Sequence, residues 1–226
     1  MTTSSLKISA PIKVTQVITA PRAGAVAGIL FALLFGVSVV LIRLSVPANS
    51  ADASAWTEST LSQADLAMRL MPFAGIFFLW FVGVVRDRLG AAEDRLFATV
   101  TLGSGLVFIA LTLASCALTG GLLDSFITGG SQALPLGVYP FVRSVTDLAF
   151  NTYAVKMASV FMLSLATLWR STHVMPRWLA YLTYLLALGM LLAFSQSLWL
   201  LLIFPAWVLL VSVYILITNL HPKELR

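Results

Sequence analysis

Residues 24–46, GAVAGILFALLFGVSVVLIRLSV, are uncharged until Arg43 and long enough to cross a lipid bilayer as a helix. A hydrocarbon core about 30 Å thick needs about 20 apolar residues in α-helical conformation. The whole chain of 226 residues has the same character, because 59% of it is hydrophobic and only 10% is charged. A soluble domain carries about 25% charged residues. The composition therefore predicts an integral membrane protein and excludes a soluble domain, a disordered chain and a disulfide scaffold.

The sequence contains six such segments. The predicted spans are 24–46, 72–87, 96–118, 145–169, 178–194 and 198–218. They make one transmembrane domain over 23–220, between a flexible cytoplasmic tail at 1–22 and a short cytoplasmic C-terminal segment at 221–226. We therefore predict an all-α, polytopic bundle of six spans whose surroundings are the lipid bilayer.

The connections between the spans carry further predictions. Apolar residues in 56–71 recur at roughly helical spacing, which predicts a short amphipathic helix on the membrane surface that ends before Pro72. A glycine pair begins a long loop over 120–140. The turn at 195–197 is so short that the fifth and sixth spans should pack as an antiparallel hairpin. Pro205 should kink the sixth span or end its first half.

Basic residues set the predicted orientation. Cytoplasmic loops of membrane proteins carry an excess of lysine and arginine. With six spans, ten basic residues fall on the side of the two termini, Arg43, Arg69 and Arg143 fall on the other side, and Lys156 falls within the membrane. Both termini are therefore predicted to be cytoplasmic, with the protein in the inner (cytoplasmic) membrane. The small residues at 48–51 are typical of a signal-peptide cleavage site, so a cleaved first segment is the alternative. The apolar segment is longer than that of a signal peptide, which favours an uncleaved first span.

Lys156 is the most unusual residue of the predicted spans. An ammonium group near the middle of a span costs about 2.5–3.5 kcal/mol, so it should face protein or water and have a partner. Thr152, Lys156 and Ser159 share one helical face. In one interpretation Lys156 belongs to an ion, proton or substrate path. In the other it is tied to helix-end carbonyls or to a carboxylate of another span and holds the bundle together.

A second polar line runs along the same predicted span. Asp147 lies on the opposite face from Lys156 and can pair with Arg143, one turn before it. Asn151 follows Asp147 by four residues and continues that line. A polar path through this span would therefore pass Lys156, Asn151 and Asp147.

Two other patterns predict contacts between helices. The first is a group of mixed charges that suits a cytoplasmic ion-pair network or a docking loop: Arg86, Asp87, Arg88, Glu93, Asp94 and Arg95. The second is a stripe of small residues on the first span, Gly24, Gly28, Ala32 and Gly36. Small residues at this interval let helix backbones approach closely, which favours packing within the bundle over dimerisation.

The residues of known catalytic and metal sites are missing from this sequence. Ser104 in the third predicted span would need a histidine base within a later span to act as the nucleophile of an intramembrane serine protease. His173 lies in a loop and His221 lies past the last span, so neither can be that base. The sequence has no HExxH motif, no clustered acids and no glycine-rich phosphate loop. A single cysteine, Cys116, excludes an internal disulfide. We predict no enzymatic activity, no cofactor and no nucleic-acid partner.

Several runs give the chain a resemblance to a known group. They are PFAGIFFLWFVGVVRDRLG at 72–90, EDRLFATV at 93–100, LGSG at 102–105, PRWLA at 176–180 and FPAWV at 204–208. Together they resemble bacterial, chiefly actinobacterial, multi-pass membrane proteins, and the layout is similar to the domain-of-unknown-function group numbered 4386. The likeness covers about 71–217. It implies fold and location, and it implies no activity.

Two classes of function fit these features. The first is a non-enzymatic accessory, sensor or stability component of the membrane, with the 86–95 loop contacting a membrane-protein partner or a second copy. The second is a small transporter or channel with a polar path near Lys156. The first is preferred because one lysine alone marks no translocation route. A lysine fully paired in a dry setting would favour the accessory role, and one in a water-filled pocket would favour transport.

Overall fold

The computed structural model describes residues 20–45, 57–89, 95–129, 137–193 and 198–220. These residues are helical almost throughout and contain no strand, so the predicted all-α class is confirmed for them. The helices are α1 (Ala20–Ser45), α2 (Glu58–Leu89), α3 (Arg95–Gly129), α4 (Val138–Asp147), the π-helix η3 (Leu148–Ala154), α5 (Val155–Thr172), α6 (Arg177–Leu192) and α7 (Leu198–Leu220). The terminal segments 1–19 and 221–226 lie outside the described residues.

Five helical segments of the described chain are long and apolar enough to cross a membrane. They are α1, α2, α3, the continuous rod α4–η3–α5, and α7. The fifth predicted span, 178–194, corresponds to α6, which has only 16 residues. The helical, apolar character of a membrane protein is thus present in the structure.

The predicted break before Pro72 is wrong. α2 runs without interruption through Pro72, and Ala64, Ala67 and Met71 are almost fully buried in the bundle. The amphipathic segment therefore begins α2 and packs on protein. A proline is tolerated inside such a helix where neighbouring helices compensate the lost hydrogen bond.

The predicted loop over 120–140 is also largely helical. α3 continues through Gly120 and Gly121 to Gly129, and α4 already begins at Val138. Leu123 is buried, so packing against the neighbouring helices stabilises this extension in spite of the glycine pair. The rod α4–η3–α5 therefore starts seven residues before the predicted span.

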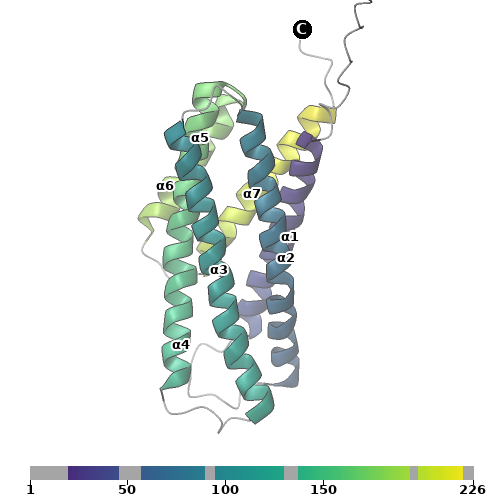
Figure 1. Cartoon of the computed structure of the whole chain (residues 1–226), viewed down its shortest axis with the longest axis vertical. Helices are drawn as coiled ribbons and strands as arrows, with labels where there is room; N and C mark the ends of the chain where they lie inside the picture. The colour runs from purple at the N-terminus through teal and green to yellow at the C-terminus, as the bar shows by residue number, and fades with distance from the viewer. Residues whose placement is uncertain (1–19, 46–56, 90–94, 130–136, 194–197, 221–226) are drawn as a thin grey trace, which may run out of the picture.

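The last two helices do not form the predicted tight hairpin. α6 packs along α5, α7 packs along α1, and the two diverge from each other in Figure 1. A hydrogen bond from Trp207 Nε1 to Thr183 Oγ1 (2.9 Å) links them. Pro205 is buried inside α7 and does not end it.

The long helices α2, α3 and α4–η3–α5 run the full length of the bundle, whereas α6 ends and α7 begins near its middle (Figure 1). One half of the molecule therefore contains α5, α6 and α7 beside α1, α2 and α3. The other half is built from α4 and the far ends of α1, α2 and α3. This unequal construction positions the site described below.

An aromatic cluster fills the half that contains α7. Phe78 of α2 lies 4.9 Å from Phe31 of α1, 5.5 Å from Phe108 of α3 and 5.6 Å from Phe161 of α5, measured between ring centroids. Phe204 of α7 completes the cluster at 4.7 Å from Phe108. All five rings are fully buried, so they join five helices in one packed core.

The small-residue stripe of α1 contacts other helices at two of its four positions. A Cβ atom added at Gly24 would lie 2.4 Å from the nearest side-chain atom of Val84, and one added at Gly28 would lie 2.0 Å from Ser212 Oγ. Ala32 is buried, but a Cβ added at Gly36 would meet nothing within 4 Å. α1 therefore approaches α2 and α7 closely near its N-terminal end only.

These spacings give a matched pair of variants. Gly24→Ala should lower the free energy of unfolding by about 1–3 kcal/mol, because the β-branched side chain of Val84 cannot move away without a backbone shift. Gly36→Ala should be neutral or stabilising by up to about 1 kcal/mol, because alanine favours the helix. Unfolding in detergent measures both values, and equal destabilisation by the two variants would contradict this packing.

Candidate functional site

Lys156 binds the C-terminal end of α6. Its Nζ donates hydrogen bonds to the backbone carbonyl oxygens of Met190 (3.2 Å), Leu191 and Ala193 (2.7 Å). The last carbonyls of a helix have no partner within the helix. They also carry the negative end of the helix dipole, which favours a cation. Of the two predicted roles for Lys156, the structure therefore shows the attachment to helix-end carbonyls.

The attachment explains how a lysine is accommodated within the bundle. An ammonium group has three N–H donors, and three carbonyl oxygens receive them. The contact also explains why α6 can end at mid-length of the bundle, since Lys156 follows directly after η3 in the middle of the long rod. Lys156 is a structural cap in this arrangement.

Replacing Lys156 tests the cap. Lys156→Met would keep the volume and apolar stem but leave three carbonyls without this donor, so it should lower the free energy of unfolding by about 2 kcal/mol or more. Lys156→Arg retains N–H donors and should lose less. Unfolding of the purified variants in detergent measures the difference, and a Lys156→Met protein as stable as the wild type would show that the cap contributes nothing.

A cavity of about 70 Å³ lies in the other half of the bundle, between α1, α2, α3, α4 and η3. Its walls are mostly apolar and include Ile42, Met68, Cys116 and Phe150. Seven polar side chains also line it: Ser115, Thr119, Tyr139, Arg143, Thr146, Asp147 and Asn151. The cavity is partly open, so a larger molecule could insert one end.

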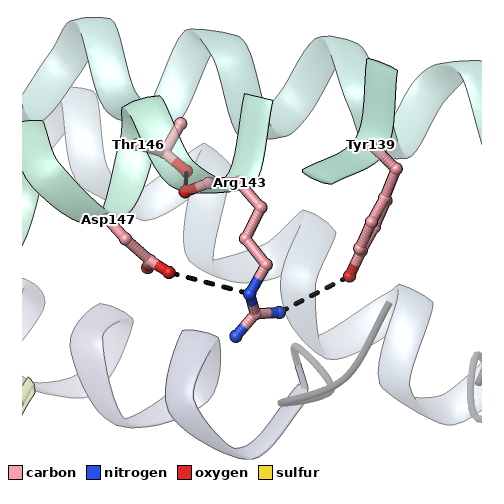
Figure 2. Close-up of polar contacts among 4 residues, drawn as sticks. All are labelled: Tyr139, Arg143, Thr146 and Asp147. Carbon is pink, nitrogen blue, oxygen red and sulfur yellow. Dashed lines mark hydrogen bonds and ion pairs between the residues drawn. The ribbon is translucent and has the colours of Figure 1, made fainter. Parts of the chain in front are cut away.

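Arg143 is the centre of the polar wall on α4 (Figure 2). Its Nε lies 3.6 Å from Asp147 Oδ2, and its Nη1 lies 3.5 Å from the Tyr139 hydroxyl oxygen. The predicted pairing of Arg143 with Asp147 is thus present. Both distances exceed those of strong charge-assisted hydrogen bonds, which are about 2.7–2.9 Å. The side chain of Asp147 remains 46% exposed, so its carboxylate is accessible beside the arginine.

The π-helix η3 places Asn151 at the buried end of the cavity wall. Asn151 is 7% exposed, and its Oδ1 has no hydrogen-bond partner. Leaving such a group unsatisfied costs about 1–3 kcal/mol. π-helical turns are rare and often occur at functional sites, because they change the direction of side chains. An unsatisfied amide in a π-turn beside a cavity is the feature that marks this region as a candidate site.

The structure separates the residues of the predicted polar path. Asp147 and Asn151 line the cavity, whereas Lys156 is bound to α6. Ser159 is buried and donates to the carbonyl of Val155, and Thr152 is half-buried on η3. One polar line of this rod therefore contacts α6, and the other lines the cavity. Lys156 and Asn151 are not brought together in one pocket.

Other predicted site residues lie elsewhere. Arg86 is exposed near the end of α2. The side chains of the other five members of the mixed-charge group, Asp87, Arg88, Glu93, Asp94 and Arg95, lie outside the described residues. Among the described residues, no three His, Cys, Asp or Glu side chains gather as they would around a metal ion.

Sequence reasoning missed part of the cavity. Tyr139 falls in the predicted loop over 120–140, although Tyr139, Arg143 and Asp147 recur every four residues and thus share one helical face. That spacing could have indicated the polar wall of α4. Ser115, Cys116 and Thr119 carry no such signal, because they look like ordinary residues of an apolar span.

Comparison with protein-family models, with curated proteins and with solved structures finds no match to this chain. The resemblance to bacterial multi-pass membrane proteins therefore stays a prediction.

Proposed function

We propose that this chain is a non-enzymatic accessory or sensor protein of the cytoplasmic membrane, with six spans and both termini in the cytoplasm. The observation that carries the proposal is the cap at Lys156. The ammonium group that would otherwise mark a polar path is bound to three carbonyl oxygens of α6. The aromatic core lies next to the cavity at Asn151, because Phe150 of the cavity wall stacks on Phe35, which contacts the core. This packed core suits binding on one side without passage to the other.

The positions of charged residues support a membrane boundary between the levels of Lys156 and Asp147. On α1 the interval between Arg22 and Arg43 is uncharged and spans about 31 Å, and on α2 the interval between Arg69 and Arg86 spans about 26 Å. Both are close to the thickness of about 30 Å of the hydrocarbon core. Lys156 lies 16 residues before Thr172, a distance of about 24 Å along the rod.

With this placement α6 can serve as one of the six proposed spans. α6 has 16 residues and a length of about 24 Å, so it reaches from the cytoplasmic boundary to the level of Lys156. The rest of the long rod then projects beyond the opposite boundary. Asp147 lies about 13 Å further along the rod, among the lipid head groups or outside them. A charge there costs far less than one at the membrane centre.

The opposite end of the bundle has a cationic hollow that suits the cytoplasmic surface. Arg170, His173 and Arg177 line a pocket of about 260 Å³ where α5 meets α6. Arg170 Nη1 donates to the Tyr181 hydroxyl oxygen at 2.7 Å, and its guanidinium lies over that ring. Arginines at this level are attracted to anionic lipids of the cytoplasmic leaflet.

Labelling of single cysteines tests the orientation. Val174 and Ile127 are exposed, at 42% and 58%, and lie near opposite ends of the bundle. In a Cys116→Ala background, a membrane-impermeant maleimide should label Ile127→Cys in intact cells. It should label Val174→Cys only after the membrane is permeabilised. The reverse pattern would overturn the proposed topology.

Ion flux separates the accessory role from the alternative of a small transporter. Proteoliposomes with an internal pH-sensitive dye and an imposed membrane potential should show no proton or cation flux above protein-free liposomes. Wild type and Lys156→Arg should behave alike. A flux in the wild type that Lys156→Met abolishes, with the variant correctly inserted, would establish a transport path and refute the proposal.

A further inference from the structure

The cavity beside η3 has a donor and acceptor pattern that selects its ligand. The hydroxyl protons of Ser115, Thr119 and Thr146 are all used, because these side chains donate to the carbonyls of Leu111, Ser115 and Arg143 at 2.8–2.9 Å. What these hydroxyls offer the cavity is therefore the lone pairs of their oxygens.

Two further acceptors line the same wall. Asn151 Oδ1 is buried without a partner, and the Asp147 carboxylate is only partly engaged by Arg143 at 3.6 Å. The wall thus offers hydroxyl, amide and carboxylate oxygens as acceptors, while Arg143, the Tyr139 hydroxyl and the Asn151 amide nitrogen also carry donors. The remaining walls are apolar. A matching ligand needs several N–H or O–H donors in a small group on an apolar body.

We infer that this cavity binds the primary ammonium group of an amphiphile, with Asn151 and Asp147 accepting its N–H donors and the apolar walls contacting its chain. A primary ammonium carries three donors and a positive charge, which suits an amide oxygen next to a carboxylate. A trimethylammonium group has the same charge but no N–H donor, so it cannot satisfy these acceptors. The inference rests on the proposed sensor function, because it supplies the ligand that the sensor would detect.

The same chemistry occurs in a free alkylamine and in a lipid with an ethanolamine head group. In a lipid the phosphate would lie next to the ammonium, and Arg143 at the mouth is a suitable partner for it. Under the proposed placement the cavity lies at the level of the outer head groups, so both sources can reach it. The experiment below distinguishes them.

Alkylation of the single cysteine of the chain measures whether the cavity is occupied. Cys116 lines the cavity and is 8% exposed, so a ligand seated there should slow its alkylation by N-ethylmaleimide. We expect octylammonium to protect Cys116 in the detergent-purified protein. Octyltrimethylammonium, which has the charge but no N–H donor, and octanoate should protect at least tenfold less well. Protection by octyltrimethylammonium or octanoate equal to that by octylammonium, or no protection by octylammonium, would overturn the inference.

Two variants test the acceptors. Asn151→Leu and Asp147→Asn should each weaken octylammonium protection about tenfold, the effect of losing one hydrogen bond or charge contact to a charged donor. Asn151→Leu should also unfold no more easily than the wild type, because it removes a buried polar atom that has no partner. Ser38→Ala is the matched control, since Ser38 Oγ is likewise buried and unpartnered but lies outside the cavity. Asn151→Leu protein that binds octylammonium as the wild type does would refute the role of the amide.

Nanodiscs of defined lipid composition show whether the ammonium group comes from a lipid or from a free amphiphile. Cys116 protected in phosphatidylethanolamine but not in phosphatidylcholine indicates the lipid head group. Cys116 reactive in both and protected by added octylammonium indicates a free amphiphile. Failure of this binding leaves the flux and labelling results of the proposed function unaffected, and flux in the wild type would leave the binding result unaffected.

Discussion

The attachment of Lys156 to the end of α6 is the contact on which the arrangement of the bundle depends. It joins the middle of the rod α4–η3–α5 to a helix that ends half-way along the molecule. A charged group in an apolar bundle is costly, and three carbonyl oxygens at the negative end of a helix offset that cost. The short helix and the buried cation each need the other. Together they divide the bundle into an aromatic half and a half with a polar cavity.

The division explains why the polar residues of one rod have different roles. On the side of α6, Lys156 meets carbonyls and has its donors occupied. Toward the other end, η3 turns Asn151 to a cavity where no side chain of the described bundle completes its hydrogen bonding. A buried amide without a partner is destabilising unless something else binds it. A ligand that donates to Asn151 would offset this cost.

The helical class and the approximate positions of the apolar helices could be predicted from the sequence, because apolar runs and the bilayer thickness leave few alternatives. The ends of the helices could not. Pro72, Gly120 and Gly121 are poor helix residues in isolation, and tertiary packing around Met71 and Leu123 stabilises the helices that contain them. The Arg143–Asp147 pair followed from spacing within one helix. Helix-end carbonyls were one of the two partners predicted for Lys156, but the helix that supplies them could not be predicted, since its carbonyls lie more than 30 residues away.

The most direct test of this account is a distance between Lys156 and α6 in the lipid-embedded protein. Lysine labelled with ¹⁵N at Nζ and methionine labelled with ¹³C at the carbonyl allow the pair Lys156–Met190 to be observed by solid-state NMR dipolar dephasing. The account predicts dephasing at hydrogen-bonding range that disappears in a Lys156→Arg protein. A Lys156 Nζ signal that shows no dephasing by methionine carbonyls and exchanges freely with water would contradict it.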